Sequence, residues 1–248
     1  MCGRAAALPV LAPTTKFTDE TLRAAVELWC SDSVTDRTAA IAQHGLIDNW
    51  DISVVTDTSR LFLGKKRFND DISGWNMSNV KNVSHMFFFA TAFNQPLDKW
   101  DVSNVERMDS MFRGATAFSQ PLDTWVVSNV NITRRMFFRA ASFNQPIGTW
   151  DVSKVTDMSH MFDGAASFNQ PLDKWVLSQV QNMSGMFEGA EAFNQPESLR
   201  RSVRPCTQCD AHASHQTNPN ARVCTWIAPD RCVPRRSLRH ASLPFAAI

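Results

Sequence analysis

Four residues near the C-terminal end have the types and the spacing of zinc ligands. Cys206 and Cys209 form a Cys-x-x-Cys pair, and His212 and His215 follow it closely. Thiolate and imidazole groups bind zinc in tetrahedral sites, but the other two cysteines of this segment lack the second paired spacing that marks a strong zinc motif. Disulfide bonds and a loosely ordered tail are the alternatives. We therefore expect no bound metal and no cofactor.

A serine recurs every 25 residues, but it lacks the partners of a catalytic nucleophile. No histidine recurs beside it to act as a base, and the serines stand at positions 53, 78, 103, 128, 153 and 178. The carboxylates in the same region vary between copies, and no Gly-rich phosphate loop is present. We expect that the protein is not an enzyme.

The serines belong to a 25-residue repeat that must position every candidate functional side chain. One unit reads W-D-V-S-N-V-x-x-M-x-x-M-F-x-G-A-x-x-F-N-Q-P-L-D-x, and it spans residues 50–196. The most regular members are the tryptophans: Trp50, Trp75, Trp100, Trp125, Trp150 and Trp175. A single unit of this size cannot cover its own apolar residues, so copies are expected to stack on one another.

The W-D-V segment predicts a short strand. Trp100 and Val102 are apolar and Asp101 between them is polar, which is the period-two pattern of a half-buried strand. Ser103 then stands at an N-cap position, and Glu106 completes a capping box.

A short helix is expected after the serine. The apolar residues that follow are spaced three and four apart, as on one helical face: Val105, Met108, Met111, Phe112 and Ala115. Glycines in four copies offer a left-handed stop, whereas Phe89 and Arg139 hold that position in the other two. The predicted fold is an α/β, leucine-rich-repeat-like solenoid of about six strand-plus-helix coils with a parallel sheet.

The unit F-N-Q-P-L-D-K-W-D-V-S-N-V…M…M-F-x-G-A resembles the BspA-like leucine-rich-repeat surface proteins, a group first catalogued as a mycoplasma family of unknown function. About fifteen positions recur in phase over residues 50–196. Residues 18–29, followed by H-G-L-I-D-N-W-D-I-S, resemble the amphipathic helix that commonly precedes such arrays. The resemblance implies a surface or secreted binding protein and no enzymatic residues.

The outward position of the predicted strand is the expected ligand-binding column. It would lie at the centre of an exposed sheet face, and it reads Asp51, Asn76, Asp101, Val126, Asp151 and Val176. Alternation of acidic and neutral residues also avoids repulsion on a solvated face, so a structural role is the alternative. Ice binding is a weak third idea because the regular hydroxyls are assigned to caps.

The tryptophan column allows two interpretations. Aligned aromatic rings can stack on sugars, but identity in all six copies is what core packing requires. We expect a buried ladder. The function predicted from these columns is a non-enzymatic binding or adhesion module for a protein or glycan.

The formal net charge of +1 conceals two unlike regions. Residues 197–248 carry eight arginines against three acidic residues, whereas residues 1–196 carry 17 basic and 21 acidic residues. Nucleic acid is therefore an unlikely partner for the array, although zinc or nucleic-acid binding through the tail is the alternative function. No apolar run is long enough to span a membrane, and the apolar stretch within residues 1–13 is weaker than the apolar region of a secretory signal peptide.

Four regions are expected along the chain. Residues 1–16 are a disordered N-terminus, and residues 17–49 form a helical cap, in which a helix runs to about Cys30 with Leu22, Ala25, Val26 and Trp29 on one face. Residues 50–196 form the array. Residues 197–248 form a poorly ordered basic tail, which would leave the last coil poorly covered and open to self-association.

Overall fold

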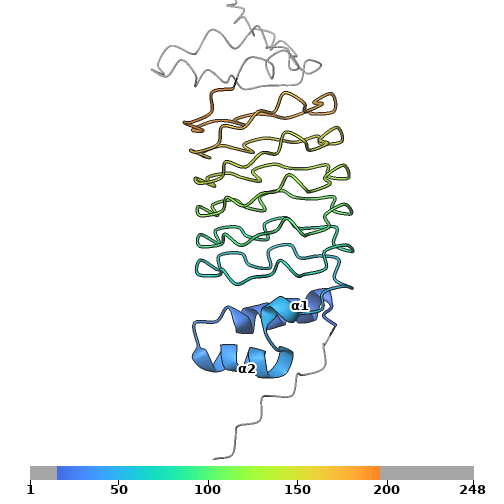
Figure 1. The fold of residues 1–248 in the computed structure, drawn as a ribbon, viewed down its shortest axis with the longest axis vertical. Coiled ribbons are helices and arrows are strands. Elements are labelled where there is room, and N and C mark those ends of the chain that lie inside the picture. The colour runs from blue at the N-terminus through green and yellow to red at the C-terminus, as the bar shows by residue number, and fades with distance from the viewer. Residues whose placement is uncertain (1–15, 196–248) are drawn as a thin grey trace, which may run out of the picture.

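A computed structural model describes residues 16–195 of the chain. Two helices, α1 (Asp19–Trp29) and α2 (Val34–His44), and the short 3-10 helix η1 (Ile47–Asn49) form an N-terminal cap. The repeats then stack on this cap as successive coils (Figure 1). We number the coils 1 to 6 by the tryptophan at which each begins. No helix within residues 16–195 combines the length and the apolar character that crossing a membrane requires.

Helix α1 is fixed by its cap and by one apolar face. Thr18 is the N-cap, and Thr18 and Thr21 each accept the backbone N–H of the other in a capping box. The buried residues of the helix are the four expected on that face: Leu22, Ala25, Val26 and Trp29. The second helix was not anticipated from the sequence.

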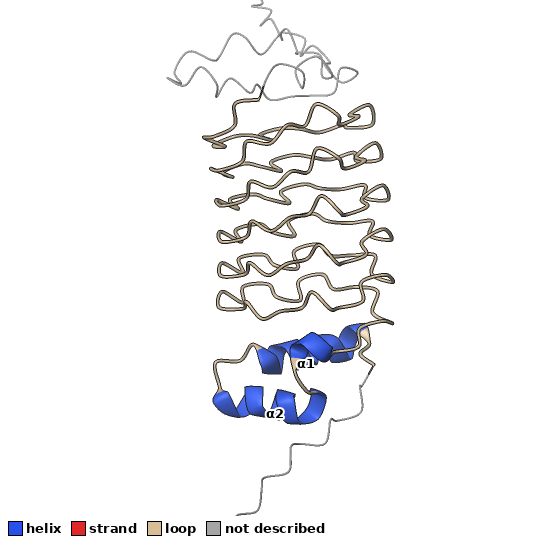
Figure 2. Ribbon diagram, viewed as in Figure 1, coloured by secondary structure: helices blue, strands red, loops and turns tan. Residues whose placement is uncertain are grey.

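The prediction of an α/β solenoid with a parallel sheet is wrong. Residues 50–195 contain no strand and no helix (Figure 2). The β-type pairing between neighbouring coils is limited to isolated parallel bridges, such as Asn82 with Arg107 and Arg107 with Ile132. Each coil is instead a succession of turns.

The W-D-V-S segment forms a turn in every coil, and in coils 1, 2, 3 and 5 the polar side chain at its second position binds the backbone of that turn. Asp101 Oδ1 accepts the N–H of Ser103 at 3.0 Å, and the N–H of Val105 donates to the Val102 carbonyl at 2.9 Å. An Asx-turn of this kind uses amides that a strand would donate to a neighbour. Ser103 is therefore not a helix N-cap, and the capping box expected with Glu106 does not form.

The M-x-x-M-F segment forms successive turns because its alternate amides donate to the next coil. The N–H of Ser110 donates to the Arg134 carbonyl at 2.8 Å, and the N–H of Phe112 donates to the Met136 carbonyl at 2.9 Å. Between them, the N–H of Met111 closes a turn on the Met108 carbonyl at 3.2 Å. A helix would require these amides for carbonyls four residues back in the same coil.

Left-handed backbone at two positions of every coil bends this segment. Ser110 (φ 58°) and Gly114 (φ 71°) are the third residues of two such turns, where a positive φ marks type II geometry. The equivalent residues in the other coils also have positive φ: Arg60, Gly64, His85, Phe89, Arg135, Arg139, His160, Gly164, Gly185 and Gly189. Phe89 and Arg139 thus adopt the glycine conformation despite their side chains.

Aromatic ladders fill the interior of the stack. Trp100 and Trp125 are nearly parallel, with ring centroids 6.4 Å apart, and each indole is about 3% exposed. Trp125 Nε1 donates at 2.8 Å to the carbonyl of Leu97, which lies 28 residues earlier, at the end of coil 2. Phe87 and Phe112 stack between coils at 5.5 Å. The core therefore runs without interruption from coil to coil.

Candidate binding surfaces

The polar members of the predicted column serve their own turns. The carboxylate of Asp151 accepts the N–H of Ser153 at 3.1 Å, and Asn76 accepts that of Ser78 at the same distance. Hydrogen bonds from the Ser103 hydroxyl and amide lower the pKa of Asp101. Local hydrogen bonding therefore explains why Asp and Asn occur in this column. It does not explain why they alternate with valine.

The column does not lie on a sheet, because residues 50–195 contain no strand. Asp51 is half-buried, and the other five members are exposed. Val126 and Val176 are each 56% exposed, and they are the members of the column whose side chains cannot accept a hydrogen bond from the turn. The other predicted column, which comprises Trp50, Trp75, Trp100, Trp125, Trp150 and Trp175, lies in the core with each side chain at most 4% exposed.

The zinc ligands considered from the sequence, Cys206, Cys209, His212 and His215, lie outside the described residues. Within residues 16–195, one group could offer metal ligands: His160, Asp163 and Glu188, whose ligand atoms lie within 4.8 Å of one another. His160 Nδ1 is 2.8 Å from Asp163 Oδ2. His160 is half-buried in a turn.

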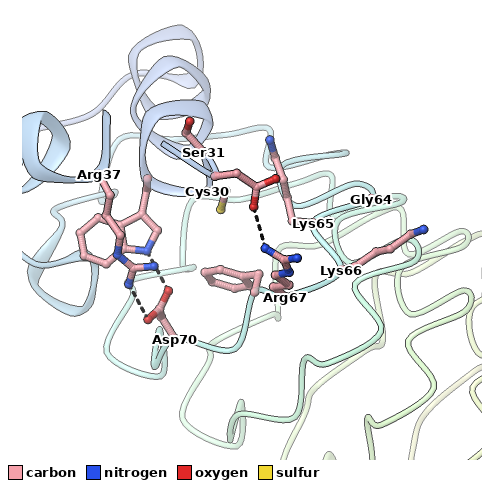
Figure 3. A pocket seen from close by; sticks show the side chains of 11 residues that line it. Cys30, Ser31, Arg37, Gly64, Lys65, Lys66, Arg67 and Asp70 are labelled. Atoms are coloured by element: carbon pink, nitrogen blue, oxygen red, sulfur yellow. Dashed lines mark hydrogen bonds and ion pairs between the residues drawn. The ribbon is translucent and has the colours of Figure 1, made fainter. Parts of the chain in front are cut away.

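A cavity of about 490 Å³ lies between the cap and coil 1 (Figure 3). Asp70 accepts hydrogen bonds from Trp29 Nε1 at 2.8 Å and from Arg37 at 2.9 Å. Arg37 also lies over the Trp29 ring, 4.5 Å from its centroid, and Arg67 pairs with Asp32 at 3.0 Å. These contacts join α1, α2 and the loop between them to the first coil.

The cavity has no activated nucleophile. Burial raises the pKa of the Cys30 thiol to about 12, so the sulfur stays protonated at neutral pH. Because the charged residues of its wall already pair across the junction, we interpret the cavity as a seam that holds the cap on the array.

The most distinctive surface lies over the turns with left-handed backbone. We call the outward side chains of residues 57–64, and of their equivalents in coils 2 to 6, the turn face. There Arg113 lies between two phenylalanine rings, 4.9 Å from the centroid of Phe88 and 4.8 Å from that of Phe138. Arg139 lies 5.1 Å from the Phe138 centroid. Phe89 packs edge-on against Phe88 and is 40% exposed.

These five residues, Phe88, Phe89, Arg113, Phe138 and Arg139, form what we call the arginine–phenylalanine cluster. Sequence reasoning missed it because the residues come from three different coils and carry no motif. Its members occupy only the last two of the eight turn-face positions, and these hold unlike residues from coil to coil. Reading those two columns in phase is the signal that would have found it.

The repeat region matches one family model twice. The model is described as a Mycoplasma protein of unknown function, DUF285, and it matches residues 31–139 and 120–226. The chain belongs to this family. No curated protein and no solved structure matches the chain. The family assignment agrees with the repeat that the sequence displays, and its description prints no activity.

Proposed function

We propose that the protein is a non-enzymatic binding module whose arginine–phenylalanine cluster contacts a partner protein. The observation that carries the proposal is the sandwich of Arg113 between Phe88 and Phe138 on a partly exposed face. Aromatic and arginine side chains are enriched where proteins bind one another, and they supply much of the binding energy there.

The contrast between inward and outward columns supports the proposal. Inward positions repeat the same aromatic residues in every coil, so they specify the stack. Outward positions on the turn face change from coil to coil: the column that contains Arg113 reads Leu63, Phe88, Arg113, Phe138, Asp163 and Glu188. Variation of this kind gives each height of the stack its own surface chemistry, which a specific partner requires.

The predicted column of aspartates supports a binding role less well than the cluster does. Its carboxylates already accept hydrogen bonds from the serine two residues on, as in Asp51 with Ser53 at 2.9 Å. The resemblance to BspA-like surface proteins supports adhesion at a cell surface as the setting. A glycan ligand and a tail-mediated zinc or nucleic-acid function are the competing proposals.

A protein and glycan array probed with the full chain tests the proposal. The informative pair of variants is Phe89→Ser, within the cluster, and Val126→Ser, an exposed apolar residue in the predicted column. We expect protein hits that Phe89→Ser abolishes and that Val126→Ser leaves intact. Glycan hits lost on Val126→Ser would refute the proposal, and loss of all hits with a zinc chelator would favour the tail.

A further inference from the structure

Four arginines gather on the turn face of coils 3 and 4. They are Arg113, Arg134, Arg135 and Arg139, and none forms an ion pair with another residue of the range 16–195. Arg107 in the same region does pair, with Asp109 at 3.1 Å. The missing pairs therefore do not reflect a general absence of carboxylates from this face.

Two of these guanidinium groups are partly desolvated. The Nε atoms of Arg113 and Arg135 are buried, and neither donates to an acceptor within the described part of the chain. These two Nε atoms are out of reach of a ligand, but both residues are only partly buried, so a carboxylate can reach the rest of each side chain. A charge-assisted hydrogen bond is stronger in such a partly desolvated place than on an open surface.

The four charges also repel one another. Burial and then the nearby guanidinium groups of Arg135, Arg139 and Arg134 lower the pKa of Arg113, and the carboxylate of Asp163 opposes this shift without forming an ion pair with Arg113. Like charges held together in a partly desolvated place raise the local positive potential, although residues 1–196 as a whole are acidic. An anion is the ligand that would relieve this repulsion.

We propose that the turn face of coils 3 and 4 binds a short acidic peptide segment of the partner, whose carboxylates are held by Arg113, Arg134, Arg135 and Arg139. The planar guanidinium fork matches a carboxylate with two parallel hydrogen bonds. This inference rests on the proposed function, because it names the chemistry of the partner at that surface.

The surroundings of the cluster favour a short peptide over a long polyanion. Towards the C-terminal coils the same face carries Asp163 and Glu188, and Asp109 lies on it in coil 3. A nucleic acid or sulfated polysaccharide that continued along the stack would meet these carboxylates, which would repel its negative charges. Towards coil 1, Leu63 and Phe89 are 43% and 40% exposed, so an apolar peptide side chain has a place to pack.

Titration with a labelled peptide tests the proposal. The probe is an eight-residue peptide of alternating Glu and Leu, and its counterpart replaces every Glu with Gln. Wild-type full-length protein is compared with Arg113→Gln, with Arg139→Gln and with the control Arg67→Gln, which is exposed at the cap junction. Because all four proteins keep the same basic tail, binding to the tail cancels in the comparison.

We expect the Glu peptide to bind and the Gln peptide not to bind. Each cluster substitution should weaken binding roughly tenfold, because it removes a charge-assisted contact, whereas Arg67→Gln should leave binding unchanged. Thermal melting of each variant should match that of the wild type, and the exposed Arg139 provides the second test if Arg113→Gln unfolds.

Equal affinity of the wild type and both cluster variants would overturn the acidic-peptide inference. Tighter binding of oligothymidylate or heparin than of the Glu peptide, with the same loss on Arg113→Gln, would also overturn it and assign the site to a polyanion. The proposed function fails separately: protein hits on the array that survive Phe89→Ser would refute it, whatever the peptide titration shows.

Discussion

Replacement of Trp125 tests whether the aromatic ladder holds the stack together. Its indole is 3% exposed and lies between Trp100, at 6.4 Å, and Trp150, at 6.3 Å between ring centroids. Truncation of a large buried aromatic side chain costs about 3–5 kcal/mol, so Trp125→Ala should lower the free energy of unfolding by that amount. The measurement is urea denaturation followed by the fluorescence of the remaining buried tryptophans.

A second variant separates ring packing from hydrogen bonding. Trp125→Phe keeps an aromatic ring but removes the Nε1–H that donates to the Leu97 carbonyl. That carbonyl retains the Trp100 amide at 3.1 Å, so the expected loss is smaller, about 1–2 kcal/mol. The neighbouring substitution Val126→Ala, at an exposed side chain, is the control and should change stability by less than about 0.5 kcal/mol. A loss below about 1 kcal/mol for Trp125→Ala, together with loss of glycan binding, would refute the assignment of the ladder to the core.

Two further changes test the turns. Gly64→Ala should destabilise the protein by roughly 1 kcal/mol because φ is +72° there, although no atom crowds the new Cβ. The control Gly74→Ala, at ordinary backbone geometry, should leave stability nearly unchanged. Equal urea midpoints for the two variants would contradict the left-handed conformation at Gly64. The lowered pKa of Asp101 means that its stabilising hydrogen bonds with Ser103 are fully present above its ordinary value of 3.8 and are lost as the pH falls through the lower folded value. Asp101→Asn should therefore match the wild type in urea at pH 7 and lose less stability than the wild type between pH 5 and pH 2. If the variant instead lost more stability than the wild type on acidification, ionisation of Asp101 would not stabilise the fold.

The period and the inward columns could be predicted from the sequence, because a stacked unit must place the same apolar residue inside in every copy. The local structure could not. Met108, Met111 and Phe112 are spaced three and one apart, and a series of turns places such residues inside as well as a helix does. The feature that decides between them is the left-handed backbone at Ser110 and its equivalents, and only one of those six positions holds a glycine.

The candidate site was missed for a related reason. The net charge of the array as a whole is negative, and this total conceals the arginines of coils 3 and 4. Arg113 and Arg135 lie 22 residues apart in the sequence, and only the stacking of neighbouring coils brings them together. The aspartate column, in contrast, was visible as a pattern, but each of its Asp residues accepts a hydrogen bond from the serine amide of its own turn.

The near-identity of the coils gives the array an adjustable length. Loss or gain of one whole 25-residue unit would leave every buried aromatic column continuous and every coil-to-coil amide paired, because each coil presents the same inward residues and the same backbone to its neighbours. Such a change in coil 1 or coil 2 would move the arginines relative to the cap by one coil. Genetic duplication or deletion of a unit can thus alter the height at which a partner is held while the interior remains the same.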